Sequence, residues 1–170
     1  MATLKQVEKS HEEIITLDAV TKWFDNWHMK KDSKGESYPP LKHGFTYGIA
    51  MNEDHIAKHL KAFNKALDTN EGYQAYDKAR IVIAEEHANK DAAGNPIMIG
   101  NKFDFKNPRE FGKRLVELQQ SDEHKEAFKE FQDFLQEKVT LDIYAVKFDD
   151  VPDVPLDIMR VLKVFIAPPE

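Results

Sequence analysis

Residues 44–90 constrain the fold most, because their pattern predicts two helices joined by a short turn. From Ile49 to Leu67 the apolar positions advance in steps of seven, four, three and four, which is the stripe of one helix face. A cluster of turn-forming residues separates this first helix, about 44–67, from a second over about 73–89. Short connections favour antiparallel neighbours, so we expect the two helices to pack on each other as a hairpin.

The composition is typical of one globular domain. The chain has 170 residues, of which 41% are hydrophobic and 32% charged, and it contains eleven Phe, five Tyr and two Trp, too many aromatic residues for a disordered chain. It has no cysteine, which excludes disulfides, thiolate catalysis and Cys-based zinc sites and suits a reducing cytoplasm. We therefore expect a soluble, cytoplasmic protein.

The charge and the apolar runs bear on partners. A net charge of −6 argues against a nucleic-acid partner, whose affinity rests on Lys and Arg contacts with phosphate. The sequence has neither the ~18-residue apolar run of a membrane span nor the apolar core of a signal peptide, so we expect no membrane association. A protein partner remains, and a homo-oligomer is left open.

The N-terminal part is predicted to be a polar lead-in over residues 1–9, followed by a helix over about 11–29. Ser10 and Glu13 have the spacing of a capping box, which marks the start of a helix. Trp27 continues the apolar stripe and is assigned to the core. Trp23 lies off the stripe, so it is the candidate for a partner-facing aromatic side chain.

The domain organisation follows from a long loop. Residues 30–43 are rich in turn formers and include Pro39-Pro40, which cannot continue a helix. We expect residues 1–43 to form an N-terminal helix with a linker arm, and residues 44–170 to form the main body of what is one compact domain overall.

The centre of the chain predicts a small β-hairpin and then a helix. Strands at about 96–99 and 102–105 flank Gly100-Asn101, which suits a tight turn. Asn107 has the place of an N-cap and Pro108 that of the first helical residue. The helix either continues to about residue 135 or breaks at Ser121, which would cap a new helix.

The end of the chain predicts a strand and an apolar helix. Residues 139–147 alternate apolar and polar side chains, so we expect a third strand that joins the β-hairpin. Residues 156–166 are too apolar for water and are predicted to be buried against their own bundle or against a partner, of which we favour the first. As partner contacts, the sequence nominates Leu156, Met159 and Phe165.

The predicted fold class is mostly α with a small antiparallel β-sheet (α+β), a helical hairpin or bundle with a sheet of two or three strands at one end. The predicted core residues are Phe45, Ile49, Ile56, Leu60, Phe63, Ile83, Phe111, Leu115, Leu118, Phe128, Phe131, Leu135 and Leu141.

Three histidines are candidate metal ligands. His55 and His59 are four residues apart, which places two imidazoles on one helix face, and an antiparallel hairpin would bring His87 towards them. The residues between His55 and His59 include no general base. Ordinary boundary histidines are the favoured interpretation, so no metal, cofactor or catalytic residue is expected. A small metal-dependent enzyme using these three histidines is the alternative.

Several motifs together resemble a loose family of small tailed-bacteriophage proteins. They are Phe45-Thr-Tyr-Gly-Ile-Ala-Met-Asn52, Glu86-His-Ala-Asn-Lys-Asp-Ala-Ala-Gly-Asn-Pro96, Lys102-Phe-Asp-Phe105 and Val139-Thr-Leu-Asp142. The resemblance covers roughly residues 45–150 and departs from the family at Gly48 and Met51, where Ala and Lys are expected. It implies no activity, catalytic residue or cofactor. It implies a phage-encoded accessory or structural protein, in the host cytoplasm. The acidic surface, Trp23 and the apolar C-terminal segment suit a protein partner, so we expect a non-enzymatic protein-binding module that inhibits a host defence or assists virion assembly.

Overall fold

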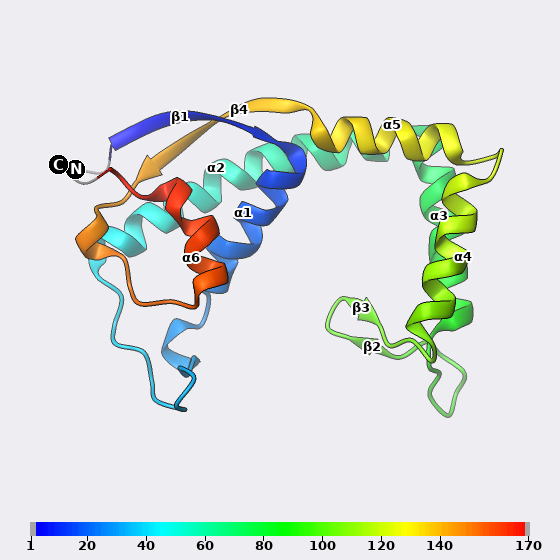
Figure 1. Cartoon of the computed structure of the whole chain (residues 1–170), viewed down its shortest axis with the longest axis horizontal. Coiled ribbons are helices and arrows are strands. Elements are labelled where there is room, and N and C mark those ends of the chain that lie inside the picture. The colour runs from blue at the N-terminus through cyan, green and yellow to red at the C-terminus, as the bar shows by residue number, and fades with distance from the viewer. Residues whose placement is uncertain (1–2, 169–170) are drawn as a thin grey trace. The chain divides into compact units, whose positions relative to one another are not determined.

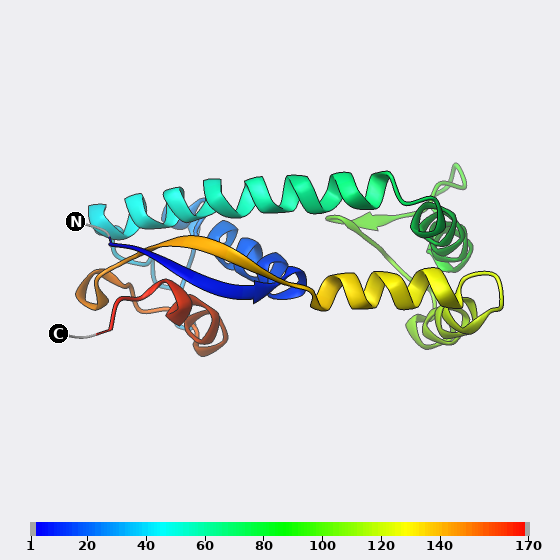
Figure 2. The ribbon, with the colours of Figure 1, turned by 90° about the horizontal axis from the view of Figure 1, so that it is seen from above.

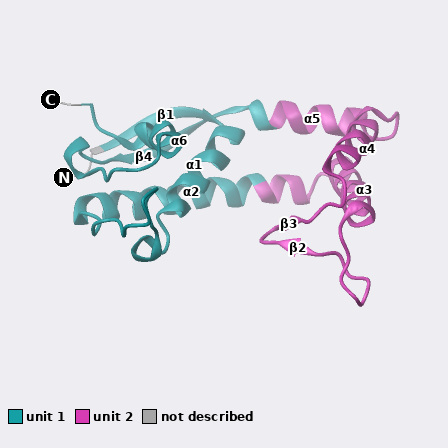
Figure 3. Cartoon of the chain, turned by 60° about the horizontal axis from the view of Figure 1, so that its bottom comes forward, with its two compact units in different colours: residues 1–63, 135–170 teal, residues 64–134 magenta. Residues whose placement is uncertain are grey.

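The computed structural model describes residues 3–168 and divides into two compact units (Figure 3). Unit 1 consists of residues 1–63 and 135–170, and unit 2 of residues 64–134. The expected α+β class is confirmed, with six α-helices and two antiparallel two-stranded sheets in the described residues. Residues 1–43, expected as an arm, belong to the same unit as the first part of the long helix that follows them.

The helices and strands of unit 1 come from both ends of the chain (Figure 1). They are β1 (Thr3–Ser10), α1 (His11–Trp23), η1 (Trp27–Met29), the first part of α2 (His43–Asp68), the end of α5 (Lys125–Gln136), β4 (Lys138–Ala145), η2 (Phe148–Asp150), α6 (Leu156–Leu162) and η3 (Lys163–Phe165).

The elements of unit 2 are contiguous in sequence. They are the end of α2, α3 (Glu71–His87), β2 (Met98–Ile99), β3 (Lys102–Phe103), α4 (Pro108–Gln120) and most of α5.

Unit 1 is built on an antiparallel pair formed by β1 and β4, with Val7 opposite Leu141. The prediction that residues 1–9 are a lead-in and that the 139–147 strand joins the β-hairpin is therefore wrong. In β1 the inward positions include Lys5 and Lys9, so the strand lacks the apolar alternation by which strands are recognised. The lysine stems cover apolar surface while their charged ends reach polar partners, as Lys5 does at the Ile166 carbonyl, 3.3 Å away.

Helices α1, α2 and α6 lie on one side of the β1–β4 pair (Figure 1 and Figure 2). The inward side chains of β4, such as Leu141 and Ile143, are fully buried against them. The buried cluster of unit 1 contains Ile14, Leu17, Val20, Phe24, Trp27, Phe45, Ile49, Ile56, Leu141, Ile143, Val146, Leu162 and Phe165.

The C-terminal segment packs into this core, which confirms the prediction of self-burial. Leu162 and Phe165 are both fully buried. The backbone of Val146 pairs in parallel with Ile166, since its N–H donates to the Phe165 carbonyl at 2.7 Å and its carbonyl accepts from Ala167 N–H at 2.8 Å. The end of the chain therefore extends the edge of the sheet just beyond β4.

The predicted N-terminal helix is correct at its start and too long at its end. Both hydrogen bonds of the Ser10–Glu13 capping box are present. The helix ends at Trp23, and Asn26 has a left-handed backbone (φ 55°) that a helix does not allow. This reversal turns Trp27 into the core, where its indole N–H donates to the Pro39 carbonyl at 2.7 Å.

The predicted helices of residues 44–90 exist with nearly the expected bounds, but the expected hairpin packing is wrong. The apolar face of α2 up to Phe63 contributes to the core of unit 1, whereas α3 packs against α4 in unit 2. The apolar stripe of α2 therefore faces the sheet and α1. The spacing of its apolar residues predicts a buried face but does not tell which element covers it.

The helix predicted from Asn107 is confirmed at its start and broken at Ser121. Asn107 Oδ1 accepts the Glu110 N–H at 3.2 Å, and Pro108 is the first helical residue. The Ser121 hydroxyl donates to the Leu118 carbonyl at 2.7 Å, which ends α4. The long single helix is thus wrong and the break is correct, although Ser121 closes the first helix instead of capping the second.

Candidate protein-binding surface

Unit 2 leaves much of its apolar surface open. Neither α4 nor α5 contains a fully buried apolar side chain, although the spacing of their apolar residues is strongly amphipathic. Phe111, Leu115, Phe128 and Phe131, all expected in the core, are only half-buried. The buried side chains of this unit are few, and among them Tyr76 and Ile83 come from α3.

Three consecutive exposed apolar side chains lie in and next to the β2 strand of the β2–β3 hairpin. Ile97, Met98 and Ile99 are 37%, 47% and 68% exposed. Gly100 has φ 61°, which allows the tight reversal that follows directly after them. Three consecutive apolar side chains are therefore presented to solvent along the strand that leads into the turn.

The base of the hairpin is held in place by the segment that follows α3. The backbone N–H of Asn89 donates to the Asp104 carbonyl at 2.6 Å, and the Asn89 carbonyl accepts from Ile97 at 2.8 Å. Phe105 stacks on Phe111 of α4 with ring centroids 4.0 Å apart and planes 14° apart. The hairpin that carries residues 97–99 is thus attached to the unit by both backbone and aromatic contacts.

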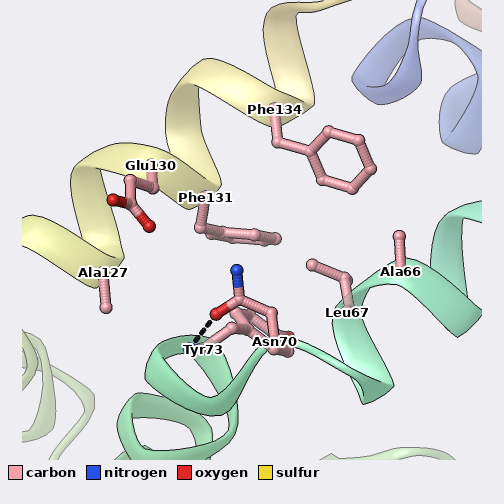
Figure 4. A pocket seen from close by; sticks show the side chains of 8 residues that line it. All are labelled: Ala66, Leu67, Asn70, Tyr73, Ala127, Glu130, Phe131 and Phe134. Carbon is pink, nitrogen blue, oxygen red and sulfur yellow. Dashed lines mark hydrogen bonds between the residues drawn. The ribbon is translucent and has the colours of Figure 1, made fainter.

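A second feature of unit 2 is an apolar groove where the end of α2 and the start of α3 face α5 (Figure 4). Its volume is about 160 Å³. Asn70 caps α3, because its side-chain oxygen accepts the Tyr73 N–H at 2.8 Å. The ring of Tyr73 lies 4.8 Å from that of Phe131. The residues lining the groove are Ala66, Leu67, Asn70, Tyr73, Ala127, Glu130, Phe131 and Phe134.

The side chains nominated from sequence as partner contacts lie in unit 1 and differ in exposure. Trp23 is half-buried against Trp27, with ring centroids 5.7 Å apart. The Lys30 ammonium lies over the Trp23 ring, 4.8 Å from its centroid. Phe165 is fully buried, so it is a core residue and not a surface contact. Met159 is half-buried, while Leu156 is 66% exposed.

The three candidate metal ligands are divided between the two units. His55 and His59 lie on the part of α2 in unit 1, and His87 lies in unit 2. His55 Nδ1 is 2.9 Å from the Asp142 carbonyl, and His87 Nδ1 is 2.9 Å from the Ile83 carbonyl. The rings of His55 and His87 thus each donate an N–H to a backbone carbonyl. Across residues 3–168, no group of three histidine or acidic side chains is placed to hold a metal ion.

Sequence reasoning missed a buried histidine at the start of α1. The ring of His11 lies 4.8 Å from that of Phe63. Burial lowers the pKa of His11, the nearby Glu137 opposes this shift, and His59 adds to it. His11 follows the cap residue directly and lies outside the apolar stripe, so only the packing of α2 identifies it as buried.

Sequence reasoning also treated residues 97–99 as an ordinary strand. The available signal was three consecutive apolar side chains directly before a two-residue turn, where a half-buried strand would alternate. The Tyr73–Phe131 groove had no such signal, because its walls come from three helices.

Comparisons with models of known protein families, with curated proteins and with solved structures find no match to this chain. No helix within residues 3–168 is long and apolar enough to cross a membrane.

Proposed function

We propose that the protein is a non-enzymatic protein-binding module that acts through unit 2. The observation that carries this proposal is the exposure of three consecutive apolar side chains, residues 97–99, on a hairpin whose base is braced by backbone hydrogen bonds. Full burial of an exposed large apolar side chain contributes about 1.5–3 kcal/mol, and these partly covered side chains can contribute a fraction of that each. The braced backbone of the hairpin loses little conformational freedom when the complex forms.

The motif resemblance to tailed-bacteriophage proteins gives this module a context. We place it in the cytoplasm of an infected host cell, where it occupies a host or phage protein. Inhibition of a host-defence protein and assistance in virion assembly both fit a small chain that binds another protein and catalyses no reaction. The alternative, a metal-dependent enzyme using His55, His59 and His87, has less support, because two of these rings already donate to backbone carbonyls and the three do not belong to one unit.

Paired captures from a host-cell lysate test the proposal. The wild-type protein is immobilised beside Ile99→Asp and a matched control, Asn101→Asp, which adds the same charge two residues away on the same hairpin. Both positions are exposed, so circular dichroism of the three proteins should coincide.

We expect one protein to be retained in about stoichiometric amount by the wild type and by Asn101→Asp, and to be lost with Ile99→Asp. Retention of the same protein by Ile99→Asp, or no retained protein at all, would contradict the proposal.

A further inference from the structure

β1 is the edge strand of unit 1 (Figure 1), and its outer side is open. In residues 3–168, β4 is the one strand that pairs with β1. The other edge of β4 is covered by α2. There the Asn52 side chain binds both backbone groups of Tyr144, and the His55 ring binds the Asp142 carbonyl. An uncovered strand edge presents unpaired N–H and C=O groups, to which another strand can add.

The hydrogen bonds of β4 determine which backbone groups of β1 point outwards. Opposite residues of an antiparallel pair either exchange hydrogen bonds or direct their backbone groups away from each other, in alternation. Because Tyr144 and Asp142 direct theirs to α2, the opposite residues Leu4 and Gln6 direct theirs to the open side, and Glu8 follows by alternation. Beyond the β1–β4 pair, the N–H and C=O groups of these three residues bind no group of residues 3–168.

The side chains agree with an open edge, which we define as the outward backbone groups of Leu4, Gln6 and Glu8. All three side chains are exposed, Leu4 by 51%. The open edge ends at Ser10, whose N–H points to the same side and is taken by the Glu13 carboxylate at 2.8 Å. The open edge is therefore a short row of alternate residues with Gln6 at its centre.

This row is complementary to itself. When two copies of β1 run antiparallel with Gln6 opposite Gln6, Leu4 of each copy is opposite Glu8 of the other. Every outward N–H then meets an outward C=O, so the pairing satisfies all the groups of the open edge. A strand from another protein can satisfy them too, but it has no reason in this sequence to match their number and spacing.

The charges of β1 select this register among those that pair outward groups. With Gln6 opposite Gln6, Lys5 of one copy is opposite Val7 of the other on the inner face of the sheet. A shift by two residues in either direction places Lys5 opposite Lys5 or opposite Lys9 of the other copy. Like charges directly opposite each other are destabilising. The lysines thus disfavour the neighbouring registers and leave the symmetric one.

We propose that β1 is a homodimer interface, through which two copies of unit 1 join into one antiparallel sheet in the order β4–β1–β1–β4. The twofold axis passes between the two Gln6 residues and is perpendicular to the sheet, so the helices of both copies cover the same face. One strand edge is a small interface, which makes the dimer weak and dependent on concentration. The interface uses no residue of the β2–β3 hairpin, so it is separate from the proposed function.

Sedimentation equilibrium of the purified full chain, from about 1 μM to about 1 mM, tests the proposal. Gln6→Pro removes the outward N–H at the twofold axis and costs no hydrogen bond to β4, since proline is tolerated where the N–H of an edge strand faces solvent. Gln6→Ala is the matched control. It loses the same side-chain hydrogen bond to Asp142 but keeps the N–H. Circular dichroism checks that both variants are folded.

A second pair of variants tests the register. Leu4→Lys places a cation opposite Glu8 of the other copy, whereas Leu4→Glu places an anion there. Both substitutions are at an exposed position, so neither disturbs the core. Because the twofold axis repeats the contact, Leu4→Lys should dimerise at least about tenfold more tightly than Leu4→Glu.

We expect the wild type and Gln6→Ala to dimerise at the upper concentrations, and Gln6→Pro to dimerise about tenfold or more weakly. A wild type that stays monomeric throughout would overturn the proposal and leave the open edge to a strand of another protein. Equal dimerisation of Gln6→Pro and Gln6→Ala, or of Leu4→Lys and Leu4→Glu, would also overturn it. A dimer lost with Ile99→Asp but unchanged by the β1 substitutions would place self-association on the hairpin instead. None of these outcomes except the last bears on the proposed function.

Discussion

Asn52 is the buried polar group on which the edge of the sheet depends. Its side chain is fully buried in the middle of α2. Its oxygen accepts the Tyr144 N–H at 2.7 Å and its nitrogen donates to the Tyr144 carbonyl at 2.9 Å, so the amide replaces a neighbouring strand along β4. We predict that Asn52→Asp destabilises unit 1 in a manner that depends on pH.

The expected loss of stability follows from the replacement of the Asn52 amide nitrogen, a donor, by a carboxylate oxygen. An ionised carboxylate still accepts from Tyr144 N–H, but it places an oxygen against the Tyr144 carbonyl, and a buried acceptor without its donor costs about 1–3 kcal/mol. The protonated acid can donate there, so folding favours the neutral form and raises the pKa of residue 52 above about 3.9. Relative to wild type, the stability of Asn52→Asp is therefore greatest below pH 4 and falls by about 1.4 kcal/mol per pH unit as the pH rises from about 3.9 to the folded pKa. At pH 7 we expect a loss of about 3 kcal/mol or more.

Tryptophan fluorescence in urea measures this loss, because Trp23 and Trp27, the two tryptophans of the chain, both lie in unit 1. Asn52→Leu serves as the control. It leaves both backbone groups of Tyr144 unpaired, so its cost of about 2–6 kcal/mol should stay constant with pH when it is compared with wild type. A cost for Asn52→Asp that does not change between pH 4 and pH 7, or that remains below about 0.5 kcal/mol, would refute the reasoning.

Three further predictions concern stability. Asn107→Ala removes the cap that accepts from Glu110 and should cost about 1 kcal/mol by circular dichroism in urea; an unchanged midpoint would contradict the cap. Gly48→Ala would drive a Cβ into Cγ1 of Val146 and should cost about 1–3 kcal/mol, with partial recovery on adding Val146→Ala; additive costs would argue against this contact. Burial lowers the pKa of His11, so the unfolded chain takes up the proton first and stability should fall as the pH drops below about 6.5. If the His11→Gln variant loses as much stability over the same pH range, another group causes the decline.

The sequence predicted well those parts of the fold that depend on local rules. The Ser10 capping box, the Asn107 cap and the ends of α2 and α3 each follow from residues within one or two helical turns. The sequence did not reveal which helices and strands pack together when they are distant along the chain. Nothing in the period of α2 tells whether its stripe faces α3 or the sheet, and Asn52 reads as a gap in that stripe although it completes the edge of β4.

The candidate surfaces were less predictable because they depend on what the fold leaves uncovered. The apolar residues of α4 and α5 have the pattern of core residues, and they remain half-open because unit 2 has few elements to cover them. Phe165 was nominated as a contact on apolarity alone, and the structure buries it. An apolar residue indicates burial or binding, and the two are separated by the packing around it.

Site-specific photo-crosslinking at Ile99 tests the central claim most directly. Benzoylphenylalanine replaces Ile99, and in a second protein it replaces Lys34 in the exposed loop of unit 1; both are irradiated in the host cells that produce them. We predict one discrete product, of this chain joined to a single partner protein, from position 99 and none from position 34. No product at position 99, or the same products from both positions, would contradict the claim that this hairpin is a protein-binding surface.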